Sequence, residues 1–221
     1  MILLLRIMLT AAMAYSLGSI SVGVVVAKLY GRIDIRKEGS GNVGMTNVMR
    51  TLGWVPSILT FAGDTLKGFL ASYLGYLIAG EIGIHVGGIA AIIGHNWPLF
   101  FNFKGGKGMS TSLGYLLMMD WRIGLILLGV QIIIVLITGL MSVASLTTAV
   151  LLPAVTALFH PTDWPCIVFT LAIAILAVYS HRQNIDRLSK GTENKLDAQK
   201  ITETSESWVR KIRNRRKQRH G

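Results

Sequence analysis

The chain has 221 residues, of which 52% are hydrophobic and 15% are charged, and its mean hydropathy is +0.53. A soluble domain carries about 25% charged residues, and the apolar residues here form long blocks instead of the short periodic stripes of soluble helices. The composition therefore excludes an ordinary soluble protein and indicates an integral membrane protein.

The apolar blocks predict the membrane helices in chain order. A span needs about 20 apolar residues, and most blocks approach this length. The block at 109–119 is too short, so it must be a half-helix, a tilted segment or part of its neighbour. We predict an all-α bundle of seven membrane helices, with five as the fallback. The blocks are 7–29, 55–79, 82–100, 109–119, 122–140, 143–159 and 163–180.

Positive charges set the predicted orientation. Nearly all Lys and Arg residues fall on one side of this map, and only Arg6 and Arg122 fall on the other. The positive-inside rule then places the N-terminus outside and the C-terminus in the cytoplasm. The apolar run continues to Leu29, so we predict a retained first span and no cleaved signal. We expect one membrane domain at 1–195 and a basic, disordered tail at 196–221 that is attracted to anionic lipid headgroups.

The first predicted inside loop is rich in glycine and small polar residues. Its glycines have the spacing of a dinucleotide-binding fingerprint, but that fingerprint follows a β-strand, and membrane helices flank this loop. Glycines still let backbone N–H groups converge on an anion, and an arginine fork suits phosphate oxygens. A flexible connector is the alternative, because turns favour the same residues. The residues expected to bind phosphate are Gly39, Ser40, Gly41, Asn42, Thr46, Asn47 and Arg50.

The second inside loop combines aromatic residues with a basic, glycine-rich turn, Lys104-Gly105-Gly106-Lys107-Gly108. It is not a Walker A loop, because Gly108 stands where Ser or Thr is required. We expect Lys104, Lys107 and the backbone of Gly105 and Gly106 to bind a second phosphate. The alternative is an interfacial anchor with lysines placed by the positive-inside rule.

The third stretch follows the last span. On a continuing helix His181 and Asn184 share one face, where they could bind an oxyanion or relay a proton. Taken alone, a helix exit with snorkelling arginines is the simpler interpretation. Ser142 and Ser145 lie at the inside turn between the fifth and sixth spans. They could complete a site or serve helix packing.

Two further patterns favour structural roles. Asp64 and Lys67 are spaced i, i+3 at the mouth of the second span, which indicates an ion pair more than catalysis. A stripe of small residues predicts close helix packing. It consists of Gly83, Gly87, Ala91 and Gly94.

Three motifs occur in order between the predicted spans. They are Gly39–Asn47 with Arg50, Gly94–Pro98 with Phe103–Gly108, and His181–Leu188 with Gly191–Glu193. Over about residues 10–195, the chain with these motifs resembles the bacterial acyl-phosphate:glycerol-3-phosphate acyltransferases. Met45 departs from the pattern, because many members of that family have Ala there.

The resemblance implies a seven-helix fold in the bacterial cytoplasmic (inner) membrane, with the active site on the cytoplasmic side. It implies that acyl phosphate and sn-glycerol 3-phosphate are the substrates, and that the acyl group moves to the 1-hydroxyl to give lysophosphatidic acid and phosphate. It implies no cofactor, no metal and no thioester carrier. The expected partners are membrane lipid and the enzyme that makes acyl phosphate, with no nucleic acid.

From these residues we expect three inside-facing stretches to converge on one pocket that captures two phosphorylated molecules. The residues predicted to be catalytic are His181, Asn184, Lys107, Ser40 and Arg50. No residue must act as a covalent nucleophile, so we predict direct attack by the glycerol hydroxyl, with His181 or the substrate phosphate as the base.

Two other functions stay open. A transporter of an anionic phosphorylated solute also has glycine-interrupted helices, and it would move labelled glycerol phosphate into liposomes without converting it. A non-enzymatic membrane anchor would use the basic tail to bind lipid or nucleic acid. An anchor would lose its activity when residues after Asn194 are deleted, whereas the acyltransferase would retain most of its activity.

Overall fold

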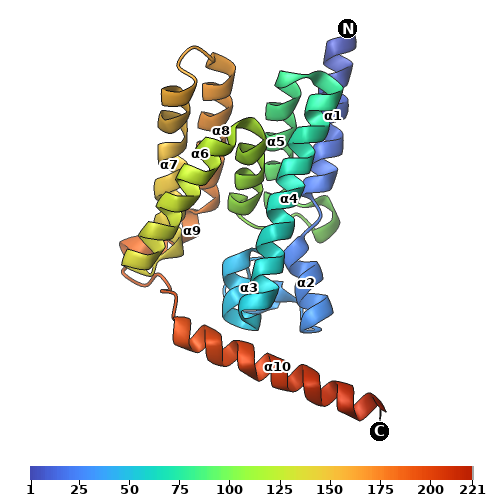
Figure 1. The fold of residues 1–221 in the computed structure, drawn as a ribbon, viewed down its shortest axis with the longest axis vertical. Helices are drawn as coiled ribbons and strands as arrows, with labels where there is room; N and C mark the ends of the chain where they lie inside the picture. The colour runs from blue at the N-terminus through green and yellow to red at the C-terminus, as the bar shows by residue number, and fades with distance from the viewer. Residues whose placement is uncertain (221) are drawn as a thin grey trace. The chain divides into compact units, whose positions relative to one another are not determined.

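The computed structural model describes the backbone of residues 1–220 and the side chains of residues 1–212 (Figure 1). Every regular element in this part of the chain is a helix, as the composition predicts. The chain forms two compact units. The first contains Met1–Ser21 and Asp64–Lys195, and the second contains Val22–Gly63 and the segment that begins at Leu196.

Several helices are long and apolar enough to cross a membrane. Four segments meet this test in the described residues, or five if α8 (Trp164–Ser180) and α9 (Arg182–Ser189), which meet at 56°, form one span. Helix α4 (Trp54–Ala79) is not among them, and its Asp64 and Lys67 lower its hydropathy. The protein is therefore a multi-pass helical membrane protein, and the count of seven spans stays a prediction.

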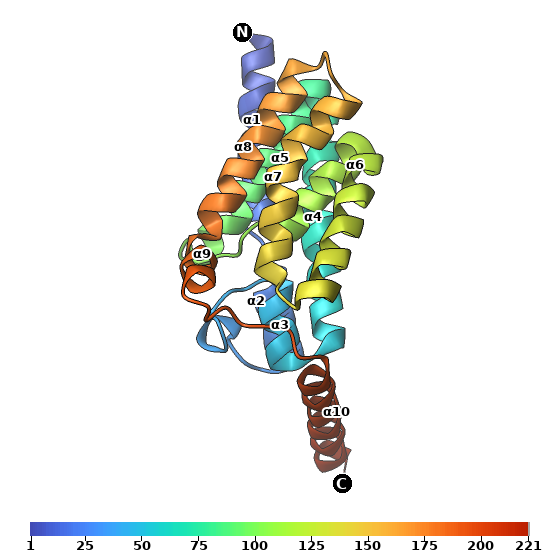
Figure 2. The same ribbon diagram turned by 90° about the vertical axis from the view of Figure 1, so that its left-hand side faces the viewer.

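Helix α5 (Glu81–Asn96) is the centre of the first unit. It packs against α1 (Ile2–Gly18), α6 (Met109–Thr138) and α8. Helix α7 (Met141–Phe159) packs against both α6 and α8 and lies between them in Figure 2. The apolar core of this unit consists of Ile92, Tyr115, Leu116, Ile123, Leu127, Leu152 and Ile173.

Glycines let α5 approach its neighbours closely. A Cβ atom added at Gly83 would collide with the backbone of Gly75 in α4, and one added at Gly94 would collide with the carbonyl oxygen of Tyr15 in α1. Helix α5 is therefore held between α4 and α1 by backbone-to-backbone contact. This confirms the packing role predicted for the small-residue stripe.

Helix α6 reverses direction at Asp120, whose backbone is extended with φ −155° and ψ 103°. A Cβ atom at Gly124 would lie 3.4 Å from the backbone nitrogen of Leu117, although seven residues of straight helix span about 10 Å. The halves before and after Asp120 therefore fold back on each other. They correspond to the blocks predicted at 109–119 and 122–140.

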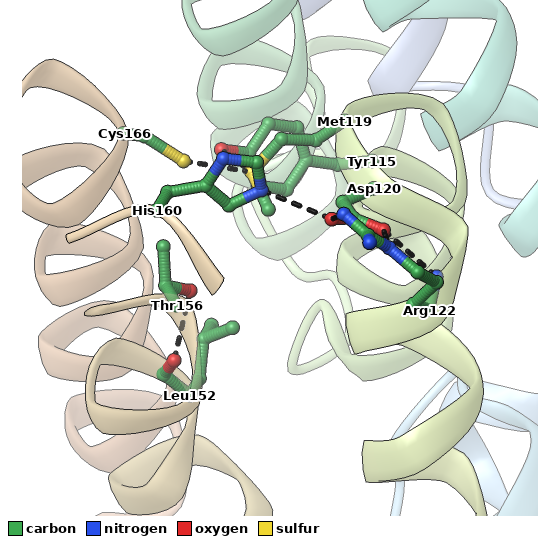
Figure 3. A network of polar contacts seen from close by, with 8 residues as sticks. All are labelled: Tyr115, Met119, Asp120, Arg122, Leu152, Thr156, His160 and Cys166. Carbon is green, nitrogen blue, oxygen red and sulfur yellow. Dashed lines mark hydrogen bonds and ion pairs between the residues drawn. The ribbon is translucent and has the colours of Figure 1, made fainter. Parts of the chain in front are cut away.

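Asp120 stabilises this turn through its carboxylate (Figure 3). It accepts hydrogen bonds from the backbone N–H of Arg122 at 3.0 Å and from the Arg122 guanidinium at 2.6 Å. Its other partner is His160 Nε2 at 3.0 Å, at the end of α7. Asp120 thus caps the second half of α6 and ties it to α7.

The predicted first span, 7–29, is broken. Helix α1 ends at Gly18 and α2 (Val22–Tyr30) begins after Ser21. At the break the Ile20 carbonyl oxygen accepts a hydrogen bond from Lys67 Nζ at 2.8 Å. Irregular backbone inside a membrane protein requires such buried partners. The apolar pattern could not reveal the break, because it continues through these residues.

The second unit contains α2, the short helix η1 (Ile35–Lys37), α3 (Met45–Leu52), the beginning of α4 and α10 (Ala198–His220). Helix α10 packs against α3, and its Ile201 is 3% exposed. The tail is therefore helical where we predicted disorder. Composition suggested disorder because it is strongly basic, whereas the apolar contact with α3 is a tertiary effect.

Candidate active site

The second predicted loop lies directly on the end of α5. The Gly106 backbone N–H donates to the His95 carbonyl oxygen at 3.0 Å. A Cβ atom at Gly105 would collide with that oxygen, and one at Gly106 would collide with the His95 ring. Only glycines fit this contact, so the double glycine fixes the path of the loop. The loop ends at Gly108, whose φ of +80° favours glycine and begins α6.

Lys107 extends from this loop to the third motif. Its ammonium group donates a hydrogen bond to Asn184 Oδ1, and Asn184 is buried on α9. The Asn184 amide donates in turn to Glu193 Oε1 at 2.6 Å. Glu193 Oε2 accepts from Arg187 Nε at 2.8 Å. These hydrogen bonds link four groups in order: the Lys107 ammonium, the Asn184 amide, the Glu193 carboxylate and the Arg187 guanidinium.

Glu193 was part of the quoted third motif but had no predicted role. Burial by itself would raise its pKa, but hydrogen bonds from Asn184 and Arg187 hold the pKa of Glu193 below its usual value. Glu193 is therefore ionised, and it fixes the orientation of the Asn184 amide. The sequence signal that could have identified Glu193 was its position after Gly191-Thr192, in the same motif as His181.

His181 lies beside this chain of bonds at the junction of α8 and α9. Its Nδ1 lies 2.8 Å from the Ala177 carbonyl oxygen. A carbonyl oxygen only accepts, so Nδ1 carries the proton and donates it. Nε2 is then the nitrogen that can interact with another group. The charge of Lys107 acts on His181, and the bond from Lys107 to Asn184 joins the second motif to the third.

The other predicted residues of the first unit differ in their surroundings. Ser142 is buried at the start of α7 and lies near Glu193. Ser145 is buried on the same helix. Lys104 is exposed on the second loop. The structure thus places Ser142 near Glu193, whereas Lys104 is exposed.

Behind the second loop lies a buried charged cluster. Lys67 Nζ is 2.8 Å from Asp64 Oδ1, and their side chains are only 5% and 2% exposed. His95 Nδ1 lies 3.5 Å from the same oxygen. This confirms the predicted ion pair and adds His95, which lies in the last turn of α5. Because Gly106 rests on His95, the cluster supports the loop that carries Lys107.

The first predicted loop belongs to the second unit, and Asn47 organises it. The Asn47 amide donates to the carbonyl oxygens of Glu38 at 3.0 Å and Asn42 at 2.8 Å. Its Oδ1 accepts from the Ser40 backbone N–H at 2.9 Å. The amide is therefore used within the loop. Asn47 holds the shape of the loop rather than presenting a free amide to a ligand.

Two glycines give the same loop its turns. Gly39 and Gly41 have φ values of +55° and +72°, which side chains rarely adopt. Asn42 Oδ1 accepts from the Gly44 backbone N–H at 2.9 Å. The Ser40 side chain is exposed at the tip. Thr46 and Arg50 lie on α3, and both are half-buried. That this loop joins the other two motifs stays a prediction.

The family model described as glycerol-3-phosphate acyltransferase matches residues 8–191. A glycerol-3-phosphate acyltransferase of Thermoanaerobacter pseudethanolicus is 41% identical over 188 residues, which cover 85% of this chain and 94% of the relative. Another from Syntrophomonas wolfei is 44% identical over 184 residues, which cover 83% of this chain and 94% of the relative.

Two solved structures are also similar. Both are crystal structures of PlsY, an integral membrane glycerol 3-phosphate acyltransferase, at 35% identity, and both comparisons cover 89% of this chain and 98% of the other chain. The glycerol 3-phosphate form has a TM-score of 0.82, and the lysophosphatidic acid form has a TM-score of 0.77. The residues that the family model matches include the first two motifs and the third as far as Gly191, so this chain belongs to the glycerol-3-phosphate acyltransferase family.

Proposed function

We propose that this protein transfers an acyl group from acyl phosphate to the 1-hydroxyl of sn-glycerol 3-phosphate. The products are lysophosphatidic acid and inorganic phosphate, in the synthesis of membrane phospholipid. Membership of the family supports a glycerol-3-phosphate acyltransferase, and the relative's two ligand forms correspond to the acceptor and the product. The observation that carries the proposal is the partly buried chain of bonds from Lys107 through Asn184 to Glu193, beside His181.

The reaction needs little beyond positioning and charge neutralisation. The glycerol hydroxyl oxygen bonds to the acyl carbon, the bond between that carbon and the phosphate oxygen breaks, and the hydroxyl proton passes to a base or to the leaving phosphate. Acyl phosphate is already activated, so orientation and electrostatic stabilisation can supply most of the rate. No covalent enzyme intermediate, metal or cofactor is part of this scheme.

Each group of the first unit has a specific task in this scheme. Lys107 neutralises charge on a phosphate, and Asn184 aims its ammonium group. Glu193 and Arg187 hold the Asn184 amide in the orientation in which its oxygen faces Lys107. His181 offers Nε2 to the glycerol hydroxyl or to the leaving phosphate, because its Nδ1 is bonded to a carbonyl oxygen.

The remaining assignments concern the two phosphates. On the second loop Gly105, Gly106 and Lys104 accompany Lys107, and Ser142 and Ser145 contribute hydroxyls. The first loop binds the other phosphate. Its ligands are Ser40 and Arg50 with Gly39, Gly41, Asn42 and Thr46, while Asn47 holds the loop in shape. Because the positive-inside rule puts these loops on the cytoplasmic side, both substrates are taken from the cytoplasm or the inner leaflet.

The decisive test is phosphate release from acyl phosphate by the purified protein, with and without glycerol 3-phosphate. Lys107→Ala should lower kcat/KM by about 100-fold or more, as the loss of one oxyanion donor does. Lys190→Ala is the matched control, because Lys190 is exposed and paired only with Asp186 at 2.9 Å. Near-normal turnover by the Lys107 variant would remove the second loop from the active site.

A further inference from the structure

Helix α10 begins after residue 191, where the match to the family ends. The family model therefore does not describe this element, and a role for it must come from its own contacts and charge. It lies in the second unit with α3 and the beginning of α4.

One face of α10 docks on the corner between α3 and α4. Trp208 Nε1 donates to the Thr51 carbonyl oxygen at 2.9 Å, and the Trp54 backbone N–H donates to Ser205 Oγ at 3.1 Å. Thr51 is in the last turn of α3 and Trp54 in the first turn of α4, so each supplies a backbone group that its own helix leaves unpaired. Helix α10 therefore caps two helix ends at once.

The close approach at this corner depends on a glycine. Gly53 joins the two helices with φ of +90°, and a Cβ atom there would collide with Ser205. Ile201, Ser205, Trp208 and Ile212 follow the spacing of a single helical face and are buried or half-buried. The docking is thus specific in geometry, and between residues 198 and 212 it leaves most of the other side chains of α10 exposed.

The charge of α10 lies in its second half. Residues 210–219 contain seven Lys or Arg residues and no acidic residue, whereas residues 198–209 contain Glu203 and Glu206 against one lysine. The side chains of Arg210 and Lys211 are exposed. A strongly cationic half-helix needs an anionic partner to offset its self-repulsion.

A lipid surface fits this half-helix better than a soluble partner. The chain spans a membrane, and only residues 190–197 separate α9 from α10. Eight extended residues reach at most about 28 Å, and the twelve helical residues before Arg210 add about 18 Å, so the basic half stays tethered to the membrane helices at a high effective concentration. Clusters of Lys and Arg beside a membrane helix bind anionic headgroups through their phosphates.

We propose that the basic half of α10 binds anionic lipid headgroups of the membrane, and that its docked half transmits this binding to α3. Lipid binding holds α10 in place, so the contacts of Ser205 and Trp208 persist and the last turn of α3 stays ordered. Arg50 lies in that turn, next to Thr51. The second step rests on the proposed function of Arg50 in binding phosphate. Its expected result is a lower KM for glycerol 3-phosphate in anionic membranes.

The test uses the full-length protein in nanodiscs of phosphatidylcholine alone or mixed with phosphatidylglycerol. Hydrogen exchange of the α10 amides and the KM for glycerol 3-phosphate are measured in both. We expect phosphatidylglycerol to slow exchange in α10 by about tenfold or more at low salt, and to lose this effect at about 1 M salt, where charges are screened within a few ångströms.

Two variants separate lipid binding from its transmission. In the charge variant, Arg213, Arg215, Arg216, Lys217 and Arg219 become Gln, and the lipid-dependent protection should disappear. In the docking variant Trp208→Phe, which removes the donor to Thr51, protection by phosphatidylglycerol should persist while the shift in KM is lost. The matched control replaces Lys190 and Lys195 with Gln outside α10, and it should behave like the unchanged protein.

Equal exchange in both lipids, or full protection in the charge variant, overturns the lipid proposal. Protection by added RNA or an acidic protein in phosphatidylcholine discs, without an effect of phosphatidylglycerol, overturns it in favour of that partner. A KM shift that survives Trp208→Phe overturns the transmission step. Lipid-dependent protection in a protein that releases no phosphate would refute the proposed function and leave lipid binding intact.

Discussion

The buried cluster behind the second loop allows a quantitative prediction, in which Lys67 is replaced by Met. Met keeps the length of the side chain but removes its charge and its donors. Asp64 then loses the ammonium group at 2.8 Å, and the Ile20 carbonyl oxygen at the helix break loses its hydrogen bond. Asp64 is 1% exposed, so it cannot replace its partner with water, whereas Ile20 is 45% exposed.

The expected loss of unfolding free energy follows from this burial. Removing one partner of a buried ion pair costs about 3–5 kcal/mol, and the lost hydrogen bond to the partly exposed Ile20 carbonyl adds about 1 kcal/mol at most. His95 Nδ1, at 3.5 Å from Asp64 Oδ1, offsets part of this cost. We therefore expect Lys67→Met to lower stability by about 4 kcal/mol. Replacing Asp64 with Leu in the same chain removes the unpaired charge, so the double variant should recover most of this loss.

The assay is reversible unfolding in mixed micelles, with a double-mutant cycle for the two residues. Lys190→Met is the control, because its pair with Asp186 is 64% and 59% exposed and should contribute about 0–1 kcal/mol. If Lys67→Met costs no more than Lys190→Met, burial does not strengthen this pair. If the double variant loses the sum of the single losses, the two residues do not act as a pair. Either result refutes the reasoning.

Three further predictions concern other parts of the molecule. Asn47→Asp should destabilise the first loop as much as Asn47→Ala, by about 3 kcal/mol, because a carboxylate cannot donate to the carbonyl oxygens that surround it; thermal unfolding measures both. Asp120→Ala should cost about 1–2 kcal/mol of stability through the lost helix cap and leave turnover unchanged, and unaltered stability would remove Asp120 from the turn. Glu193 has a lowered pKa, so its stabilising effect should be complete above the usual value of 4.5 and fall as pH drops through its lower folded-state pKa. A stability difference between Glu193 and its Gln variant that does not shrink in acid would contradict this.

Much of the local chemistry of the site could be predicted from the sequence. The glycines of the first two loops, Lys107 and the His181 motif form short-range patterns. In the structure the glycines adopt the turns and close contacts that only glycine allows. The contact of Lys107 with Asn184 could not be derived in the same way. It joins residues 77 positions apart, and such a contact depends on how α6 and α8 pack around α5.

The breaks in the helices show the same limit. The apolar block continues through Ser19–Ser21, so hydropathy does not show the break there. The break is visible only in the folded structure, where Lys67 donates a hydrogen bond to the Ile20 carbonyl oxygen. The turn at Asp120 was visible as a gap between two apolar blocks, but its partner His160 lies on another helix. In α10, the basic composition suggested disorder. The role of the face that carries Trp208 could be recognised only from its packing against α3.

The sequence by itself determined that this protein lies in a membrane and which family it belongs to, because composition and short motifs are local properties of the chain. The tertiary structure decided which motif residues meet, that Glu193 holds Asn184, that Asn47 supports its own loop and that the basic tail is a docked helix. These depend on packing between distant segments, where burial makes each unpaired polar group costly and so selects its partner.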